Sequence, residues 1–176
     1  PLSHYAITKC KAEEYIMDWG NGICLRLATV FGSSPRMRTD LLVNDFVYKT
    51  LTEGVLVLFQ SHFKRNYIHV RDIAYTFMHC IENYNKLNGE VFNVGLSNAN
   101  LNKRELAETI KSYLPNLVII ENEFGTDKDN RNYIVSNDKL EKTGWKPRYT
   151  IEDGINELIS AYKMIITDNN KKYTNL

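Results

Sequence analysis

A tyrosine and a lysine four positions apart, in Tyr5-Ala6-Ile7-Thr8-Lys9, have the spacing that most directly suggests chemistry. On a helix these two side chains lie one turn apart on the same face. A lysine ammonium beside a phenol stabilises the phenolate, and such a phenol can take a proton from a substrate hydroxyl as hydride leaves the carbon. Of the 11 tyrosines in the chain, only Tyr5 has this relation to a lysine. The competing interpretation is an incidental pair on a solvated helix face.

The sequence around this pair predicts alternating helices and strands. Helical spacing of apolar residues runs from Tyr5 to Trp19, and Gly20 and Gly22 end it. The apolar segment Ile23–Ala28 is of the kind that forms a strand buried in a parallel sheet. Alternation of this kind is typical of an α/β fold. Further helices are expected over residues 40–53, 72–84, 137–143 and 151–165, and one more runs from a cap at Asn100 or Asn102 to residue 114. Further strands are expected over residues 55–59, 67–70, 91–94 and 117–120.

Two polar residues in the middle of the chain are expected to be structural. Asp72 stands at the start of a predicted helix, where a carboxylate suits the helix dipole, so we expect it to cap that helix. His69 lies in a predicted strand and is expected to be a core histidine with satisfied hydrogen bonds.

The composition excludes several classes of protein. Hydrophobic residues make up 43% of the 176 residues and charged residues 24%, which is typical of a globular domain. A formal net charge of +1 predicts neither a nucleic-acid partner nor a membrane surface, and no apolar run approaches the ~20 residues that span a bilayer. The three cysteines, Cys10, Cys24 and Cys80, lie far apart. We therefore expect free thiols in a reducing cytoplasm, with neither a disulfide framework nor a metal site.

Four segments after the Tyr5–Lys9 pair also have the form of sequence motifs. They are Arg26-Leu27-Ala28-Thr29-Val30-Phe31-Gly32, Arg65-Asn66-Tyr67-Ile68-His69-Val70-Arg71-Asp72, Gly89-Glu90-Val91-Phe92-Asn93-Val94-Gly95, and Arg131 to Pro147 with its Gly144-Trp145-Lys146-Pro147 ending. In this order, they resemble motifs of the extended short-chain dehydrogenase/reductase family, the sugar-nucleotide epimerases and dehydratases. The resemblance covers roughly residues 1–165, and five ordered motifs are more specific than any single one.

The resemblance implies a fold and a division of the chain. The fold would be the C-terminal part of a doubly wound Rossmann-type parallel sheet, with a small α/β substrate-binding cap. Residues 1–40 would end the dinucleotide-binding domain, 41–166 would form mainly the cap with segments returning to the sheet, and 167–176 would be a polar tail. The family's Gly-rich dinucleotide turn does not occur in this sequence. We therefore expect the cofactor-binding half to lie before Tyr5, and these 176 residues alone not to turn over substrate.

The resemblance also implies roles at the reaction centre. Tyr5 would be the catalytic acid/base, and Lys9 would hold the nicotinamide ribose and tune Tyr5. The cofactor would be NAD, with NADP possible. Thr29 and Val30 would contact the cofactor, and Thr29 would also face the sugar. The family often has Asn at the position of Thr29, which leaves the identity of the sugar open.

Further residues would bind the substrate, a nucleotide-diphosphate sugar. Arg65 and Arg131 would hold its diphosphate, whose oxygens match the fork of a guanidinium group. Arg36 and Asn44 would make additional substrate contacts. The competing interpretations are surface charges for the three arginines and an exposed helix amide for Asn44.

The predicted function is the catalytic and substrate-binding portion of an NAD(P)-dependent nucleotide-sugar epimerase or dehydratase, with transient oxidation of the sugar. Decarboxylase chemistry is a further branch that the sequence allows. The alternatives are a non-catalytic NAD(P)-binding module of the same fold and an NADP-dependent reductase of a small carbonyl substrate. Family members are often dimers, so we expect a homodimer through the Tyr5–Trp19 helix, unless that helix is buried in its own subunit.

Overall fold

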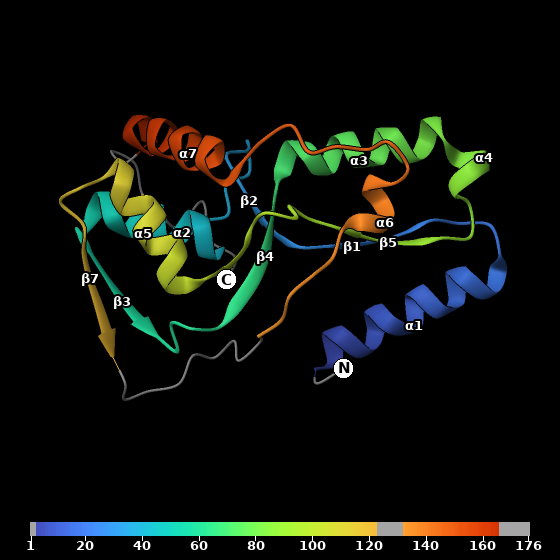
Figure 1. Ribbon diagram of the computed structural model, residues 1–176, viewed down its shortest axis with the longest axis horizontal. Coiled ribbons are helices and arrows are strands. Elements are labelled where there is room, and N and C mark those ends of the chain that lie inside the picture. Colours follow the sequence, from blue (N-terminus) through green and yellow to red (C-terminus); the bar gives the residue numbers. More distant parts are fainter. Residues whose placement is uncertain (1–2, 123–131, 166–176) are drawn as a thin grey trace.

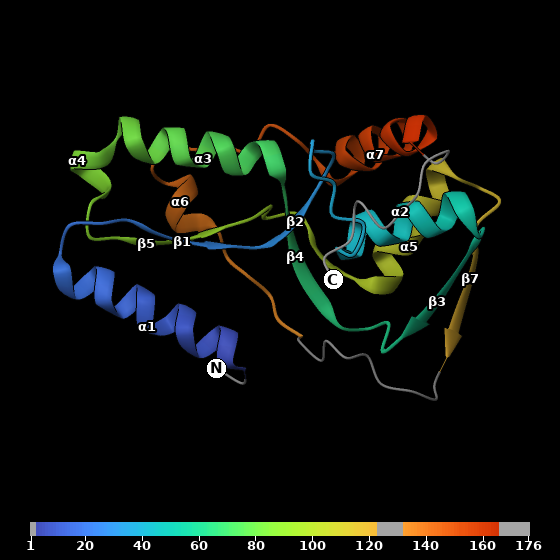
Figure 2. The same ribbon diagram turned by 180° about the vertical axis from the view of Figure 1, so that it is seen from behind.

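Two parallel strands run along one half of the molecule. The computed structural model describes residues 3–122 and 132–165. β1 (Cys24–Leu27) pairs with β5 (Val91–Val94), in register from Cys24 beside Val91 to Leu27 beside Val94. Both strands therefore end at the same edge. One helix lies on one side of this pair and three on the other (Figures 1 and 2): α1 (His4–Trp19) on the first, and α3 (Val70–Glu82), α4 (Tyr84–Leu87) and α6 (Asp138–Glu141) on the second.

Helix α1 begins and ends as the sequence predicts. Ser3 caps it by accepting a hydrogen bond from the backbone N–H of Ala6, and Gly20 ends it in the left-handed region at a φ of 71°. None of its residues is buried within the chain. A hydrogen-bonded ion pair between Glu13 and Arg26 of β1, with Nε 2.8 Å from Oε2, holds the helix against the strand.

A second sheet crosses the centre of the molecule. β4 (Lys64–His69) pairs in parallel with β2 (Thr29–Phe31) and antiparallel with β6 (Asn100–Asn102). The strand expected at 67–70 thus starts earlier and ends at residue 69. β2 and β6 were not predicted: each has only three residues, too few to show an apolar alternation.

The remaining elements pack together on the other half of the molecule (Figure 1). β3 (Val55–Phe59) and β7 (Val118–Asn122) form a parallel pair. α2 (Leu42–Thr52) lies against both α5 (Lys103–Tyr113) and α7 (Ile151–Ile165). Fully buried side chains from all three helices form the core, among them Val43, Val47, Leu106, Ile110, Ile155 and Leu158.

The helices confirm most of the predicted boundaries. Asn102 caps α5 in a reciprocal capping box with Glu105. α7 has the predicted range, but α3 starts at Val70, two residues before the expected start. The reason is that His69, and not Asp72, is its capping residue: His69 Nδ1 accepts the backbone N–H of Arg71 at 3.2 Å. Within the described residues, no helix is both long and apolar enough to cross a membrane.

Helix α7 approaches β2 so closely that position 154 has no space for a side chain. A Cβ at Gly154 would lie 2.2 Å from Cε2 of Phe31 and 3.2 Å from Cδ2 of His69. Real Cβ atoms do not approach carbon this closely, so the contact requires glycine although glycine is unfavourable inside a helix. The first turn of α7 therefore packs directly against the end of β2.

Replacing Gly154 by alanine tests this contact. In an open helix the change stabilises by about 1 kcal/mol, but here we expect a loss of about 1–3 kcal/mol because the ring of Phe31 must move. The matched control is Asn156→Ala, an exposed position on the same helix, which should be neutral or stabilising. The free energy of unfolding from urea titration measures both. Stabilisation by Gly154→Ala would contradict the described packing.

Candidate active site

The predicted catalytic pair lies at the N-terminal end of α1. Lys9 Nζ is 5.7 Å from the centroid of the Tyr5 ring, so the two side chains are neighbours as the spacing predicts. The Tyr5 side chain is 71% exposed. A phenol beside an ammonium group and open to solvent is accessible to a substrate hydroxyl.

The predicted pocket-lining residues follow the carboxyl end of β1. The backbone N–H of Ala28 donates to the carbonyl of Val94 at 2.9 Å, which joins the ends of β1 and β5. Thr29 and Val30 come next, in β2, and are half-buried. Ligands of open α/β sheets bind beyond the carboxyl ends of the strands. The structure thus places Thr29 and Val30 at the edge where a ligand is expected.

The position of α1 brings the Tyr5–Lys9 pair and the carboxyl end of β1 to the same side of the molecule. Glu13 holds α1 to Arg26 near the end of β1, and Tyr5 lies eight residues before Glu13, about 12 Å further along the helix. Thr29 lies three residues beyond Arg26, about 10 Å further along the chain if the strand stays extended. α1 runs back along β1, so the N-terminal end of the helix and the carboxyl end of the strand lie on the same side of the molecule (Figure 1).

The predicted substrate-binding arginines differ in their surroundings. Arg65 is only 3% exposed, and its guanidinium carbon is 5.5 Å from the centroid of the Tyr133 ring. The interpretation of Arg65 as a surface charge is therefore wrong. Arg36 lies exposed on the loop after β2, and Arg131 is outside the described residues.

Asn44 is a buried residue that binds the loop after β2. Its side chain is 1% exposed, so the interpretation as an exposed helix amide is wrong. Its Oδ1 accepts the N–H of Gly32 at 3.1 Å, and its Nδ2 donates to the carbonyls of Gly32 and Arg38 at 3.3 and 2.9 Å. Both amide hydrogens are thus engaged within the chain, and they hold the two ends of the loop together.

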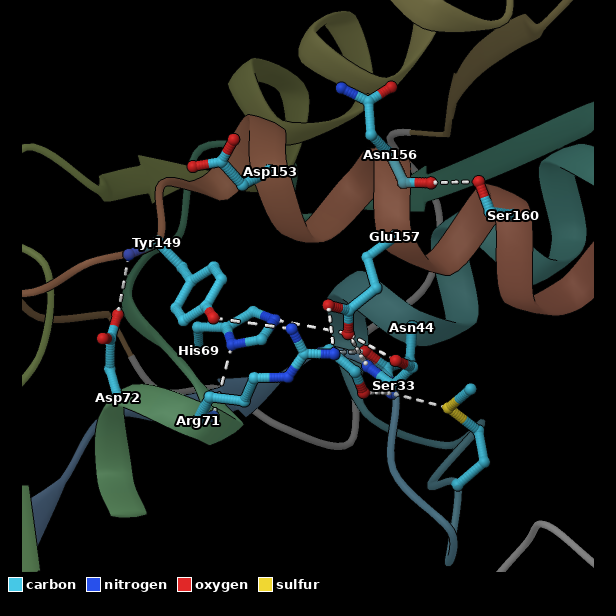
Figure 3. Close-up of polar contacts among 12 residues, drawn as sticks. Ser33, Asn44, His69, Arg71, Asp72, Tyr149, Asp153, Asn156, Glu157 and Ser160 are labelled. Atoms are coloured by element: carbon cyan, nitrogen blue, oxygen red, sulfur yellow. Dashed lines mark hydrogen bonds and ion pairs between the residues drawn. The ribbon is translucent and has the colours of Figure 1, made fainter. Parts of the chain in front are cut away.

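A cluster around Glu157 was not found from the sequence (Figure 3). Glu157 Oε1 accepts hydrogen bonds from the backbone N–H of Ser33 at 2.8 Å and from the Ser33 hydroxyl. Its Oε2 lies 3.0 Å from Arg71 Nη2. His69 is fully buried, stacks on Tyr149 with ring centroids 4.5 Å apart, and points Nε2 at Glu157 Oε1 over 3.5 Å. Since 124 residues separate Ser33 from Glu157, no local pattern in the sequence indicates this contact.

The protonation of this cluster follows from burial and hydrogen bonding. Burial lowers the pKa of His69, although the nearby carboxylates of Glu157 and Asp72 oppose the shift. Burial alone would raise the pKa of Glu157, but the hydrogen bonds from Ser33 and the charge of Arg71 hold that pKa below its ordinary value. The neutral ring accepts the Arg71 N–H at Nδ1 and so carries its proton on Nε2, facing the carboxylate. His69 is a core residue as predicted, but its hydrogen bonds are not all satisfied, because Nε2 has no hydrogen-bond partner among the described residues.

Asp72 has a different partner from the expected one. It is fully buried, and its two carboxylate oxygens accept the backbone N–H groups of Arg148 and Tyr149 at 2.9 and 3.1 Å. The prediction that Asp72 caps its own helix is wrong, because the chain before α7 offers two unpaired donors to it. Asp72 thereby places Tyr149 against His69.

The chain belongs to the NAD dependent epimerase/dehydratase family. Residues 1–95, more than half of the 176, match the family. The predicted resemblance is confirmed at the level of the family.

Individual relatives are distant and about twice as long. The dTDP-4-dehydro-6-deoxyglucose reductase of Escherichia coli is 25% identical over 174 residues, which cover 93% of this chain and 53% of that protein. The structure resembles dTDP-glucose 4,6-dehydratase of Bacillus anthracis in complex with NAD, with a TM-score of 0.77 and 24% identity over 93% of this chain and 53% of the other. It equally resembles RMD of Pseudomonas aeruginosa complexed with NADPH, with a TM-score of 0.77 and 19% identity over 93% and 57%. These similarities confirm the predicted α/β fold class, and the chain spans about half the length of each relative.

The lowered pKa of His69 predicts how stability depends on pH. A histidine whose pKa is lower in the folded state contributes stability that is complete above its ordinary pKa of 6.5 and is lost as the pH falls through the folded value. The unfolding free energy should therefore decrease from about pH 7.5 to about pH 5. The lowered pKa of Glu157 also makes the protein less stable toward low pH, but only below the ordinary pKa of this carboxyl group, 4.5.

Urea titrations across this range, on the wild type and on His69→Gln, separate the histidine from other groups. The variant should be less stable at every pH but should show a smaller decrease toward low pH. An equal slope in the two proteins would contradict a neutral, buried His69.

Proposed function

We propose that this chain supplies the acid/base and the substrate-binding part of an NAD(P)-dependent enzyme that acts on a nucleotide-diphosphate sugar. The observation that supports it most is the exposed Tyr5 beside Lys9, on the same side of the molecule as the carboxyl ends of β1 and β5. Membership of the family and the dTDP-sugar relative point to the same class of reaction.

The chemistry assigned to the chain is proton transfer. Tyr5 accepts the proton of a sugar hydroxyl as the phenolate and, as the phenol, returns it when the carbonyl is reduced again, with the ammonium group of Lys9 beside it. Bound NAD or NADP would supply the hydride acceptor. Thr29 and Val30 would line the pocket for the nicotinamide and the sugar, and Lys9 would hold the ribose.

The residues assigned to substrate binding divide into two groups. Arg65 and Arg131 would hold the diphosphate, and the burial of Arg65 supports this role, because a guanidinium removed from water interacts more strongly with an anion. Arg36 would contact the substrate from the loop after β2. Asn44 of α2 holds the same loop through its three hydrogen bonds to Gly32 and Arg38, and so would affect substrate binding indirectly.

A homodimer through α1, in the cytoplasm, is part of the same proposal. The helix buries none of its residues within the chain, and Tyr15 and Trp19 are 79% and 68% exposed. A helix buried in its own subunit is thus not observed within the described residues. Trp19→Lys in the complete protein should lower the molar mass measured by light scattering from that of a dimer to that of a monomer, while an unchanged mass would reject α1 as the interface.

Replacing Tyr5 by phenylalanine tests the acid/base assignment. In the complete protein, with NAD and a nucleotide sugar, kcat should fall by about 10²- to 10⁴-fold and KM should change little, because the variant keeps the ring but has no proton to exchange. Tyr15→Phe is the matched control, since Tyr15 is an exposed tyrosine on the same helix, and it should leave kcat unchanged.

Two results would argue against the proposal. Full activity in Tyr5→Phe would remove the acid/base role, and no conversion of any nucleotide sugar by the wild type would favour the non-catalytic module. A preference for small carbonyl substrates would favour the simple reductase.

A further inference from the structure

We propose that Glu157 is a positioning residue for the site: it holds the loop after β2 in one conformation and fixes it to the start of α3. This inference rests on the proposed function for what the site does. It adds a residue of α7, outside the five sequence motifs, to the residues on which substrate binding depends.

The first observation is that β2 and β4 separate at the end of their paired segment. Their register ends with Phe31 beside His69. Beyond this pair, the chain after β2 continues into the loop that carries Arg36, and the chain after β4 turns into α3. Glu157 contacts both continuations, through Ser33 on the first and Arg71 on the second. One carboxylate thus connects the loop after β2 with the start of α3, directly after the backbone pairing of β2 and β4 ends.

The second observation is that packing leaves one side of the loop open. A cavity of about 680 Å³ lies between the loop, the start of α3 and the end of α7, and Ser33, Pro35 and Met37 line it from the loop side. Side-chain packing therefore fixes only part of the loop. Polar contacts from outside the loop add to this packing: Asn44 binds Gly32 and Arg38, and Glu157 binds Ser33.

The third observation is that Glu157 is itself held in place. It lies one turn after Gly154, where α7 packs directly on Phe31 and His69, and His69 faces its Oε1. Its lowered pKa keeps the carboxylate ionised at neutral pH, so it remains a hydrogen-bond acceptor for Ser33. A fixed, charged acceptor restrains its partners more strongly than a mobile one, because little side-chain entropy is lost on forming the bonds.

These contacts give Glu157 an effect on the site without contact with the substrate. Thr29 lies four residues before Ser33, and Arg36 three residues after it. When the bonds to Ser33 are lost, the loop gains alternative conformations, and only a fraction of molecules presents the substrate-binding arrangement. The expected consequence is a higher KM, with a smaller change in kcat because Tyr5 and Lys9 lie on a different element.

The test compares Glu157→Ala and Glu157→Gln with the control Glu152→Gln in the complete protein. Glu152 is exposed on the same helix. At a temperature well below unfolding, KM for the nucleotide sugar should rise at least about tenfold in Glu157→Ala, the size expected when hydrogen bonds to a charged group are lost. Glu157→Gln should recover part of this loss, since its amide oxygen still accepts from Ser33, and Glu152→Gln should match the wild type. A folded Glu157→Ala with wild-type KM would overturn the proposal.

Amide hydrogen exchange gives a second readout that does not depend on activity. In Glu157→Ala, exchange should accelerate at least about tenfold in residues 32–38 and stay unchanged in α5. A uniform acceleration across the chain would indicate a merely structural role and would overturn the proposal, as would an unchanged loop. If the wild type converts no nucleotide sugar, the proposed function fails, and the exchange experiment still decides whether Glu157 holds the loop.

Discussion

The burial of His69 is the constraint on which much of the described structure depends. A ring fully removed from water needs neighbours around it, and β2, α3, α7 and the segment before α7 provide them. Phe31 meets it edge-on with centroids 5.4 Å apart, Tyr149 stacks on it, Arg71 donates to Nδ1, and Glu157 faces Nε2. β2, β4, α3 and α7 are thereby brought to one point.

Several features of the chain follow from this arrangement. α7 can approach only because position 154 is glycine, and a Cβ at Gly32 would lie 2.6 Å from His69 Nε2. Gly32 also has a φ of 109°, a conformation that other residues rarely adopt. Asp72 then places Tyr149 by binding the two backbone N–H groups before α7. The loop that leaves this point carries Arg36, so the packing around one histidine shapes the proposed substrate side of the site.

The sequence predicted the parts of the structure that depend on local patterns. α7 has strong helical spacing and α1 ends clearly at Gly20, and β1 and β5 are short apolar segments bounded by glycine or turns, so their positions were predicted nearly to the residue. The Tyr5–Lys9 pair was predictable because helix geometry alone brings residues four apart together. The order of five motifs was sufficient to identify the family.

Contacts between distant segments were not predictable in this way. β6 is a polar three-residue strand that exists only because β4 offers it an edge. Asp72 resembles a helix cap, and only the fold brings Arg148 and Tyr149, more than 70 residues later, to its carboxylate. Ser33 and Glu157 are ordinary polar residues on a loop and a helix, and their pairing becomes visible only when α7 is packed on β2.

The central claim is that Tyr5 and Lys9 meet the reacting sugar at the carboxyl edge of β1 and β5. A crystal structure of the complete protein with NAD and a nucleotide-diphosphate sugar tests it most directly. The account predicts the Tyr5 phenol oxygen within hydrogen-bond distance of a sugar hydroxyl, Lys9 on the nicotinamide ribose, and Arg65 beside the diphosphate. A sugar bound away from Tyr5, with the Tyr5–Lys9 pair still facing solvent, would contradict it.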